Sequence, residues 1–186
     1  IIPEFAAQAI AQHCDAQRYD IPAIVVASRR AGSMAIPLVK ELTKAVAAAN
    51  PEAAIHVHWG STSQDVIDTA TVLVTRDALV QLDATLTHLA GRLLELAEQH
   101  LDTPVLARTL MQPAQVISLG FKFTGWAAPL VRAHQQLRAQ AQRSLQLQLG
   151  GAVGTLAVMG HKGPAVVKRV AAELNLTEPQ SNWHTQ

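Results

Sequence analysis

The stretch from Asp65 to Gln99 constrains the fold more than any other part of the sequence. It contains no proline, and only Gly91 weakens a pattern in which apolar residues recur every three or four positions. This pattern predicts a single helix of roughly 50 Å, at 1.5 Å per residue. Other apolar residues, such as Leu79 and Val80, lie off the main stripe. A helix that is apolar on several sides is typical of the interior of a helical bundle.

The rest of the chain also favours helices, and no segment alternates strictly enough to require a strand. Capping residues, prolines and apolar spacing predict helices over residues 4–17, 21–31, 35–49, 113–149 and 164–174. Residues 105–112 are expected to be a short connector, and the glycine-rich residues 150–155 a flexible loop. We therefore expect an all-α bundle of long helices.

The expected organisation is a small N-terminal helical domain over residues 1–60, followed by the first part of a central long-helix bundle domain over residues 61–186. The chain opens on Ile1 without a methionine and stops after Gln186 without a polar tail. These ends predict an incomplete chain, a piece of a longer protein.

Composition excludes several classes of protein. The chain is 49% hydrophobic but only 4% aromatic, so a core of small aliphatic side chains is expected, with part of the apolar surface buried against other protein. The net charge is +1 and no dense basic run is present, which speaks against nucleic-acid binding. No apolar run reaches the roughly 20 residues of a membrane span. The lone cysteine, Cys14, is consistent with a reducing compartment, and we expect a cytoplasmic protein.

The loop that precedes the long helix is the first cluster of candidate functional residues. Hydroxyl and amide side chains at the positive end of a long helix can bind a carboxylate, and a nearby histidine can move a proton. The alternative is that these residues only cap the helix. A zinc site is not expected, since the loop supplies no third ligand at a clear spacing. The candidates in this loop are His58, Thr62, Ser63 and Gln64.

Two further clusters follow. Arg108 could clamp a carboxylate through two parallel hydrogen bonds, with Thr109 and Gln112 as neighbouring donors. The alternative for Arg108 is a surface salt bridge. Three glycines in Gly150–Thr155 could let the backbone approach a ligand, but the segment matches neither a P-loop nor a dinucleotide fingerprint.

Together, the three clusters resemble the signatures of the fumarase/aspartase superfamily. Residues 58–65 resemble its first signature, H-x-G-x-T-S-x-D, and residues 107–112 resemble its second. Residues 151–155 resemble the glycine turn that follows the second long helix in that superfamily. The order and spacing agree, and the resemblance covers nearly the whole chain.

Within the superfamily, the sequence is most similar to the 3-carboxy-cis,cis-muconate cycloisomerases. Adenylosuccinate lyases carry a histidine where this chain has Leu110, and an aliphatic side chain cannot donate a proton. The cycloisomerases also lack that histidine, and residues 35–40, 64–69 and 183–186 resemble theirs. The alternatives are an adenylosuccinate lyase or other lyase of the superfamily, and a non-catalytic helical oligomerisation module.

The resemblance implies the remaining expectations. It implies a homotetramer with active sites shared between subunits, a small tricarboxylate substrate, and neither metal nor organic cofactor. It implies interconversion of 3-carboxy-cis,cis-muconate and a carboxymuconolactone in aromatic degradation, through an enediolate-like carbanion. His58 and His184 would serve binding or proton transfer, while the other candidates stabilise the negative charge. The catalytic base should lie beyond Gln186, so this piece alone should be inactive. Four further histidines are expected to be solvated or structural: His56, His88, His100 and His134.

Overall fold

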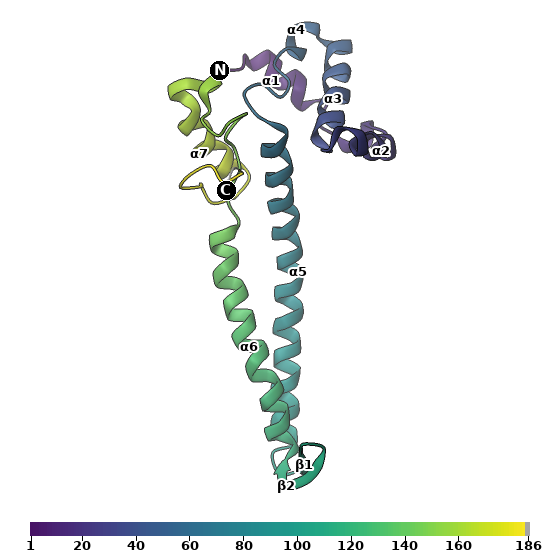
Figure 1. The fold of residues 1–186 in the computed structure, drawn as a ribbon, viewed down its shortest axis with the longest axis vertical. Helices are drawn as coiled ribbons and strands as arrows, with labels where there is room; N and C mark the ends of the chain where they lie inside the picture. Colours follow the sequence, from purple (N-terminus) through teal and green to yellow (C-terminus); the bar gives the residue numbers. More distant parts are fainter. Residues whose placement is uncertain (185–186) are drawn as a thin grey trace. The chain divides into compact units, whose positions relative to one another are not determined.

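A computed structural model describes residues 1–184 of the chain (Figure 1). It divides into two compact units, Ile1–Leu73 with Gln146–Gln186, and Val74–Leu145. The fold is all-α, as predicted, except for one two-stranded sheet that was not predicted. The predicted boundary between residues 60 and 61 concerns the domains of the complete protein and stays a prediction. The segment 183–186 resembles that of the cycloisomerases in sequence, and its last two residues, 185 and 186, lie outside the described residues.

Local capping sets the helix boundaries of the first unit. Helix α2 (Ile21–Ala31) begins after Asp20, whose carboxylate accepts a hydrogen bond from the Ala23 N–H at 3.0 Å. It ends at Gly32, whose φ of 72° forms a left-handed cap. The side-chain oxygen of Asn50 likewise accepts from the N–H of Ala53 at 3.1 Å, and so separates α3 (Ala35–Ala49) from the short α4 (Pro51–Ala54).

The first helix is shorter than predicted. Helix α1 (Glu4–Ala11) stops well before residue 17, and a 3₁₀ turn, η1 (Ala16–Arg18), follows it. The carboxylate of Asp15 caps this turn by accepting from the Gln17 N–H at 3.0 Å, and the Tyr19 hydroxyl donates to the carbonyl of His13 at 2.6 Å. Such side-chain bonds to the backbone compete with helix continuation.

The core of the first unit is built from small side chains, as its composition predicts. Ala6, Val46 and Ala53 are fully buried where α1, α3 and α4 meet. The unit also contains the first turns of α5 (Ser63–Gln99), the 3₁₀ segment η2 (Ala157–Lys162) and α7 (Gly163–Glu173). The predicted helices at 35–49, 65–99 and 164–174 are therefore confirmed to within two residues at each end.

The second unit corrects the prediction for residues 105–112. This segment is not a plain connector. Strand β1 (Pro104–Thr109) pairs antiparallel with β2 (Gln112–Ser118), and α6 (Leu119–Ser144) starts only after the second strand. The predicted helix from residue 113 was therefore six residues too long at its start. It was also too long at its end, because α6 stops at Ser144 and the N–H groups of residues 147 and 148 are hydrogen-bonded to other segments.

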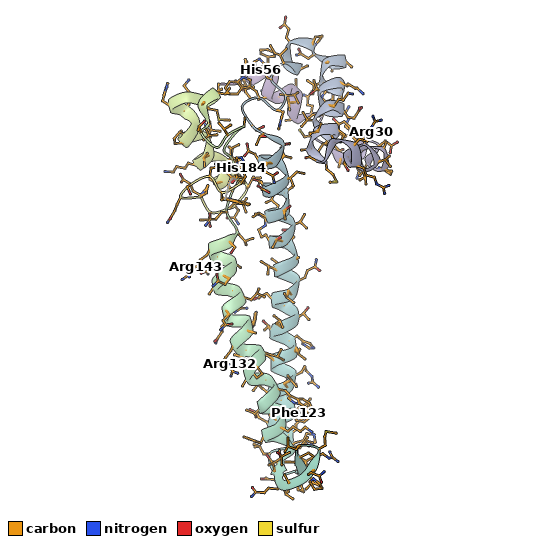
Figure 2. All side chains as sticks on the ribbon, viewed as in Figure 1. Arg30, His56, Phe123, Arg132, Arg143 and His184 are labelled. Carbon is orange, nitrogen blue, oxygen red and sulfur yellow. The ribbon has the colours of Figure 1, made fainter. Side chains whose placement is uncertain are left out.

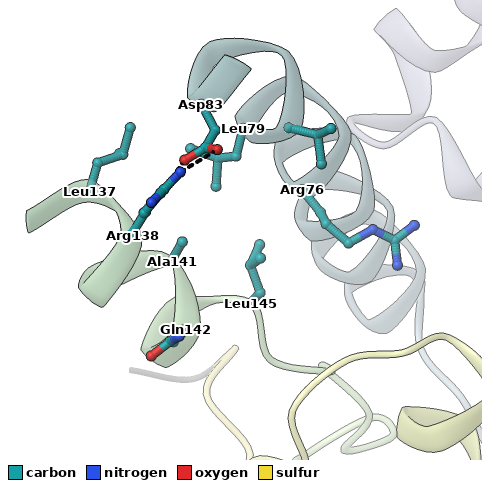
Figure 3. Close-up of a pocket in the computed structure, with 9 residues that line it drawn as sticks. Arg76, Leu79, Asp83, Leu137, Arg138, Ala141, Gln142 and Leu145 are labelled. Atoms are coloured by element: carbon teal, nitrogen blue, oxygen red, sulfur yellow. Dashed lines mark hydrogen bonds and ion pairs between the residues drawn. The ribbon is translucent and has the colours of Figure 1, made fainter. Parts of the chain in front are cut away.

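Helices α5 and α6 are joined within the second unit at two places. Near the hairpin, a Cβ on Gly120 would lie 2.4 Å from the carbonyl oxygen of Ala97, so only glycine permits this approach. Farther along, Asp83 of α5 accepts hydrogen bonds from His134, at 2.6 Å, and from Arg138 of α6. A cavity of about 340 Å³ lies between the helices beside the Asp83–Arg138 pair (Figure 3).

Many apolar side chains of α5 are exposed on this chain. Val80, which the sequence placed off the main stripe, is 67% exposed. Others that are exposed on the same helix are Val74, Leu82, Leu89 and Leu94. In residues 1–184, no helix combines the length and the hydrophobicity that crossing a membrane would require.

Candidate active site

A buried carboxylate organises the start of α5. Asp65 is 3% exposed, and its two oxygens accept four hydrogen bonds. One oxygen accepts from the backbone N–H groups of Thr62 and Gly151, each at 2.9 Å. The other accepts from the N–H of Gly150 at 2.9 Å and from the side chain of Gln148 at 3.2 Å. Asp65 therefore ties the first signature to the glycine loop, 85 residues later in the chain.

Gln148 connects this carboxylate to the segment that carries His184. Its side chain is 1% exposed and uses both ends of its amide. The oxygen accepts from the N–H groups of Trp183 and His184, at 2.9 and 3.0 Å. Its nitrogen lies 2.7 Å from Asn182 Oδ1 and 2.9 Å from His184 Nδ1. We call Asp65, Gln148, Asn182 and His184 the Gln148 network.

The backbone of Gln148 is also fixed to α5. The Thr69 hydroxyl donates to its carbonyl at 2.8 Å, and its N–H donates to the Thr69 oxygen at 3.1 Å. The network thus holds His184, half-buried, beside the first turns of α5 (Figure 2). Two candidates that are far apart in the sequence, the first-signature loop and His184, are therefore brought into one part of the first unit.

His58 occupies a strained position in the loop before α5. Its φ is 59°, in the left-handed region that non-glycine residues seldom adopt. Its Nδ1 lies 2.9 Å from the Ser61 hydroxyl. Burial lowers the pKa of His58 below its ordinary value of 6.5, and the negative charge of Asp65 partly opposes this shift. His58 is therefore neutral near pH 7 and able to accept a proton.

The three other candidates in this loop differ in whether their side chains are free to bind a ligand. The hydroxyls of Thr62 and Ser63 have no side-chain hydrogen-bond partner within residues 1–184, so they can donate to a ligand at the positive end of α5. Gln64 is exposed and its amide donates to Asp68 at 2.7 Å, one helical turn away. That contact is an ordinary helix-surface pair.

The glycine loop makes room for a side chain. A Cβ on Gly154 would lie 1.9 Å from Asn182 Nδ2, and one on Gly150 would lie 2.8 Å from the same amide. A Cβ on Gly151, whose φ is 72°, would lie 3.1 Å from the Gly60 carbonyl oxygen in the first-signature loop. In this structure, the space that a ligand was expected to approach holds the amide of Asn182.

A cavity of about 270 Å³ adjoins the Gln148 network. Its polar lining comes from Ser61, Asp65, Thr69 and Gln148, and its apolar lining includes Val66 and side chains of the 147–149 and 170–174 segments. A small pocket with a few convergent polar groups on a mainly apolar wall is typical of small-molecule sites.

The second-signature candidates lie on the hairpin of the second unit. Arg108, Thr109 and Gln112 are exposed, and Thr109 pairs with Gln112 across a two-residue turn. Among residues 74–145, no carboxylate forms an ion pair with Arg108, so the salt-bridge alternative is not observed within this unit. The guanidinium is available to a carboxylate of a ligand or another protein chain.

The turn itself is strained and apolar. Leu110 and Met111 both have positive φ, 47° and 64°, in a turn that normally selects asparagine, aspartate or glycine. Leu110 is 93% exposed. Backbone strain of this kind is concentrated at functional sites, because it persists only where the surrounding structure maintains it.

The four histidines that were expected to be solvated or structural have other environments. His134 pairs with Asp83, His100 lies 3.1 Å from the Thr103 hydroxyl, and His88 is exposed. His56 is half-buried in the turn after α4. Within the part of the chain that the structure describes, no group of three or more potential ligands could hold a metal ion.

Sequence reasoning missed the residues that position His184. Asp65 was recognised in the signature but not counted among the candidates, while Gln148 and Asn182 were not singled out. The available signal was weak: Gln148 is a polar residue between two leucines, two positions before the glycine loop. Its importance depends on contacts across 34 to 83 residues of sequence.

Comparisons with known proteins identify the family of this chain. A family model described as lyase matches residues 1–186. The 3-carboxy-cis,cis-muconate cycloisomerase of Bradyrhizobium diazoefficiens is 48% identical over 185 residues, which cover 100% of this chain and 41% of that protein. A nitrosuccinate lyase of Streptomyces davaonensis is 44% identical, covering 98% of this chain and 40% of that protein.

A solved structure shows the same fold. The crystal structure of 3-carboxy-cis,cis-muconate lactonizing enzyme from Pseudomonas putida superimposes with a TM-score of 0.96 at 45% identity, covering 100% of this chain and 42% of that one. The chain thus spans about two fifths of the length of the relatives it matches. Because the family model covers every residue, the chain belongs to this lyase family, the fumarase/aspartase superfamily, whose first two signatures and glycine turn residues 58–65, 107–112 and 151–155 resemble.

Proposed function

We propose that the complete protein containing this chain is a cycloisomerase that interconverts 3-carboxy-cis,cis-muconate and a carboxymuconolactone. The observation that carries the proposal is the similarity over the whole chain to cycloisomerases, at 48% identity in sequence and a TM-score of 0.96 in structure. Leu110, exposed at the hairpin tip, supports it. Adenylosuccinate lyases carry a histidine at this position, and an aliphatic side chain cannot donate a proton as a histidine can.

The chemistry of this reaction fits the groups that the chain supplies. In the lactonising direction, an oxygen of one substrate carboxylate bonds to a carbon of the conjugated double bond. The electron pair passes to the carbon beside another carboxylate, as an enediolate, and that carbon takes a proton. Donors fixed before the reaction stabilise this charge better than mobile water does. Thr62, Ser63 and the N–H groups that begin α5 provide such donors in the first unit. Arg108, Thr109 and Gln112 provide them on the hairpin.

The complete protein is proposed to act as a homotetramer in the cytoplasm, without a cofactor. The exposed apolar side chains of α5, with Val80 67% exposed, support burial against other subunits. Sedimentation of the complete protein is expected to give four copies. Val80→Asp should shift the distribution toward smaller species, whereas the same change at the exposed Thr85 should not. A monomeric complete protein would contradict this part of the proposal.

The test of activity is an ultraviolet absorbance assay for loss of 3-carboxy-cis,cis-muconate by the complete protein. The double variant Thr62→Ala/Ser63→Ala should lose turnover while staying folded by circular dichroism. Thr71→Ala, farther along α5, is the matched control and should keep turnover, because its hydroxyl donates to the Ile67 carbonyl of its own helix. If both proteins turn over the muconate equally, the first-signature hydroxyls only cap the helix. If the unmodified protein does not turn it over, the proposed substrate is wrong.

A second candidate is an elimination on nitrosuccinate, because a nitrosuccinate lyase is 44% identical over nearly the whole chain. The two reactions share proton movement next to a carboxylate and differ in the leaving group, nitrite or a ring carboxylate. Nitrosuccinate and adenylosuccinate are therefore the parallel substrates of the assay. Turnover of either one, without turnover of the muconate, would assign the protein to that reaction.

A further inference from the structure

We propose that Gln148 and Asn182 hold neutral His184 as the tautomer with its proton on Nδ1, so that Nε2 is the nitrogen that accepts a proton. Gln148 and Asn182 are then positioning residues for His184. The inference deepens the proposed function and rests on it for the role of His184, although the tautomer itself is measurable without any activity.

The first step fixes the amide of Gln148. One end of this amide lies 2.9 Å from the backbone nitrogen of Trp183 and 3.0 Å from that of His184. Backbone N–H groups only donate, so this end must be the oxygen. The opposite end, Nε2, is therefore a donor with two hydrogens. It faces Asp65, Asn182 and His184.

The second step fixes the amide of Asn182. The atom nearest to Gln148 Nε2, at 2.7 Å, must accept a hydrogen bond, because Nε2 has no lone pair to offer. This atom is therefore Oδ1. The backbone N–H of His184, 3.4 Å from the same atom, agrees with that assignment. Asn182 Nδ2 then points to Gly154, where the missing Cβ leaves space for it.

The third step assigns the proton of His184. Its Nδ1 lies only 2.6 Å from Asn182 Oδ1. Two lone pairs at this distance would repel, so a proton lies between them, on Nδ1. The two hydrogens of Gln148 Nε2 are directed to Asp65 Oδ1 and Asn182 Oδ1, and neither is required for Nδ1. In neutral His184 the lone pair is consequently on Nε2.

This assignment determines which ring nitrogen of His184 takes part in proton transfer. When the lactone opens, a C–H bond beside a carboxylate breaks, its electron pair enters the enediolate, and the ring C–O bond then breaks. The released proton needs an acceptor, and neutral His184 accepts only at Nε2. In the reverse direction charged His184 can return a proton from Nε2 while Nδ1–H stays bonded to Asn182. Asp65, buried behind Gln148, is the charged member of this network.

The direct test is nuclear magnetic resonance of the complete protein labelled with ¹⁵N-histidine, at a pH where His184 is neutral. His184→Gln identifies the signal by its disappearance. We expect the two-bond ¹H–¹⁵N pattern of a ring protonated at Nδ1. The pattern of a ring protonated at Nε2 would overturn the inference. Because this measurement needs no substrate, its result is independent of whether the protein turns over the muconate.

Kinetics test the positioning role with two variants of one residue. Asn182→Leu removes the acceptor for Nδ1–H and should lower kcat about tenfold or more, with little change in KM. Asn182→Asp keeps an oxygen there and should restore most of kcat. It should also move the pH profile of kcat to higher pH, since a carboxylate beside an imidazole favours the charged ring.

The two variants separate positioning from a purely structural role. If Asn182 only fills the space beside Gly154, leucine and aspartate should impair the protein alike, and the pH profile should not move. That result would refute the positioning role even if both proteins fold. Thermal unfolding of each variant is measured beside the kinetics, so that loss of fold is not mistaken for loss of kcat.

Discussion

Replacing Asp65 with asparagine tests whether the buried carboxylate holds the site together. Asparagine has nearly the same shape but keeps only one of the two acceptor oxygens. The retained oxygen can keep two of the four hydrogen bonds described for Asp65. The new NH₂ group would face two hydrogen-bond donors, which are either the N–H groups of Thr62 and Gly151 or those of Gly150 and Gln148.

The magnitude follows from the number of bonds lost. A hydrogen bond to a charged group contributes about 1.5–3 kcal/mol, and a buried donor left without a partner costs about as much. Two lost bonds therefore give about 3–6 kcal/mol, and local relaxation favours the lower part of this range. We expect Asp65→Asn to reduce the free energy of unfolding by about 4 kcal/mol, a large part of the 5–15 kcal/mol typical of a domain.

The assay is urea unfolding of the complete protein, followed by circular dichroism. Asp68→Asn is the matched control, because Asp68 is on the same helix and accepts only the exposed side chain of Gln64. It should change the free energy of unfolding by no more than about 0.5 kcal/mol. If Asp65→Asn behaves like this control, the four hydrogen bonds do not contribute as the geometry indicates, and the account of the network is wrong.

Three further predictions concern the hairpin, His58 and Arg108. Leu110→Asn combined with Met111→Gly should relieve the backbone strain of two left-handed residues and raise the free energy of unfolding in urea by about 1–2 kcal/mol. Unchanged or lower stability would show that the turn is not strained. Because the pKa of His58 is lowered in the folded state, the unfolded state binds a proton more readily, and the free energy of unfolding should decline as the pH falls below about 6.5. His58→Gln should reduce this decline between pH 7.5 and 5. If both proteins show the same dependence of stability on pH, the assignment of a partly buried, neutral His58 is refuted. Arg108→Ala in the complete protein should lower kcat/KM at least about tenfold. Arg92→Ala should not, because Arg92 forms an exposed ion pair with Glu95 on α5. If the two variants have equal kinetics, Arg108 is not part of the site.

Periodicity predicted the helices well where a stretch is long or well capped. The helix from Ser63 to Gln99 and the helix from Ala35 to Ala49 follow from apolar spacing and from the breakers that bound them. The hairpin was missed for a physical reason. Its turn residues, Leu110 and Met111, carry none of the asparagine or glycine signals that announce a two-residue turn. The antiparallel pairing of β1 with β2 closes this turn, although its two residues do not favour it.

The sequence by itself determined the helical architecture, the family through two signatures and a glycine turn, and the candidate donors at the start of α5. These properties depend on residues close together in the chain, through helix periodicity, capping and motif spacing. Only the tertiary structure decided how His184 is held, because Asp65, Gln148 and Asn182 meet across up to 83 residues of sequence. A buried amide acquires its role from the donors and acceptors that surround it, and folding brings those groups together.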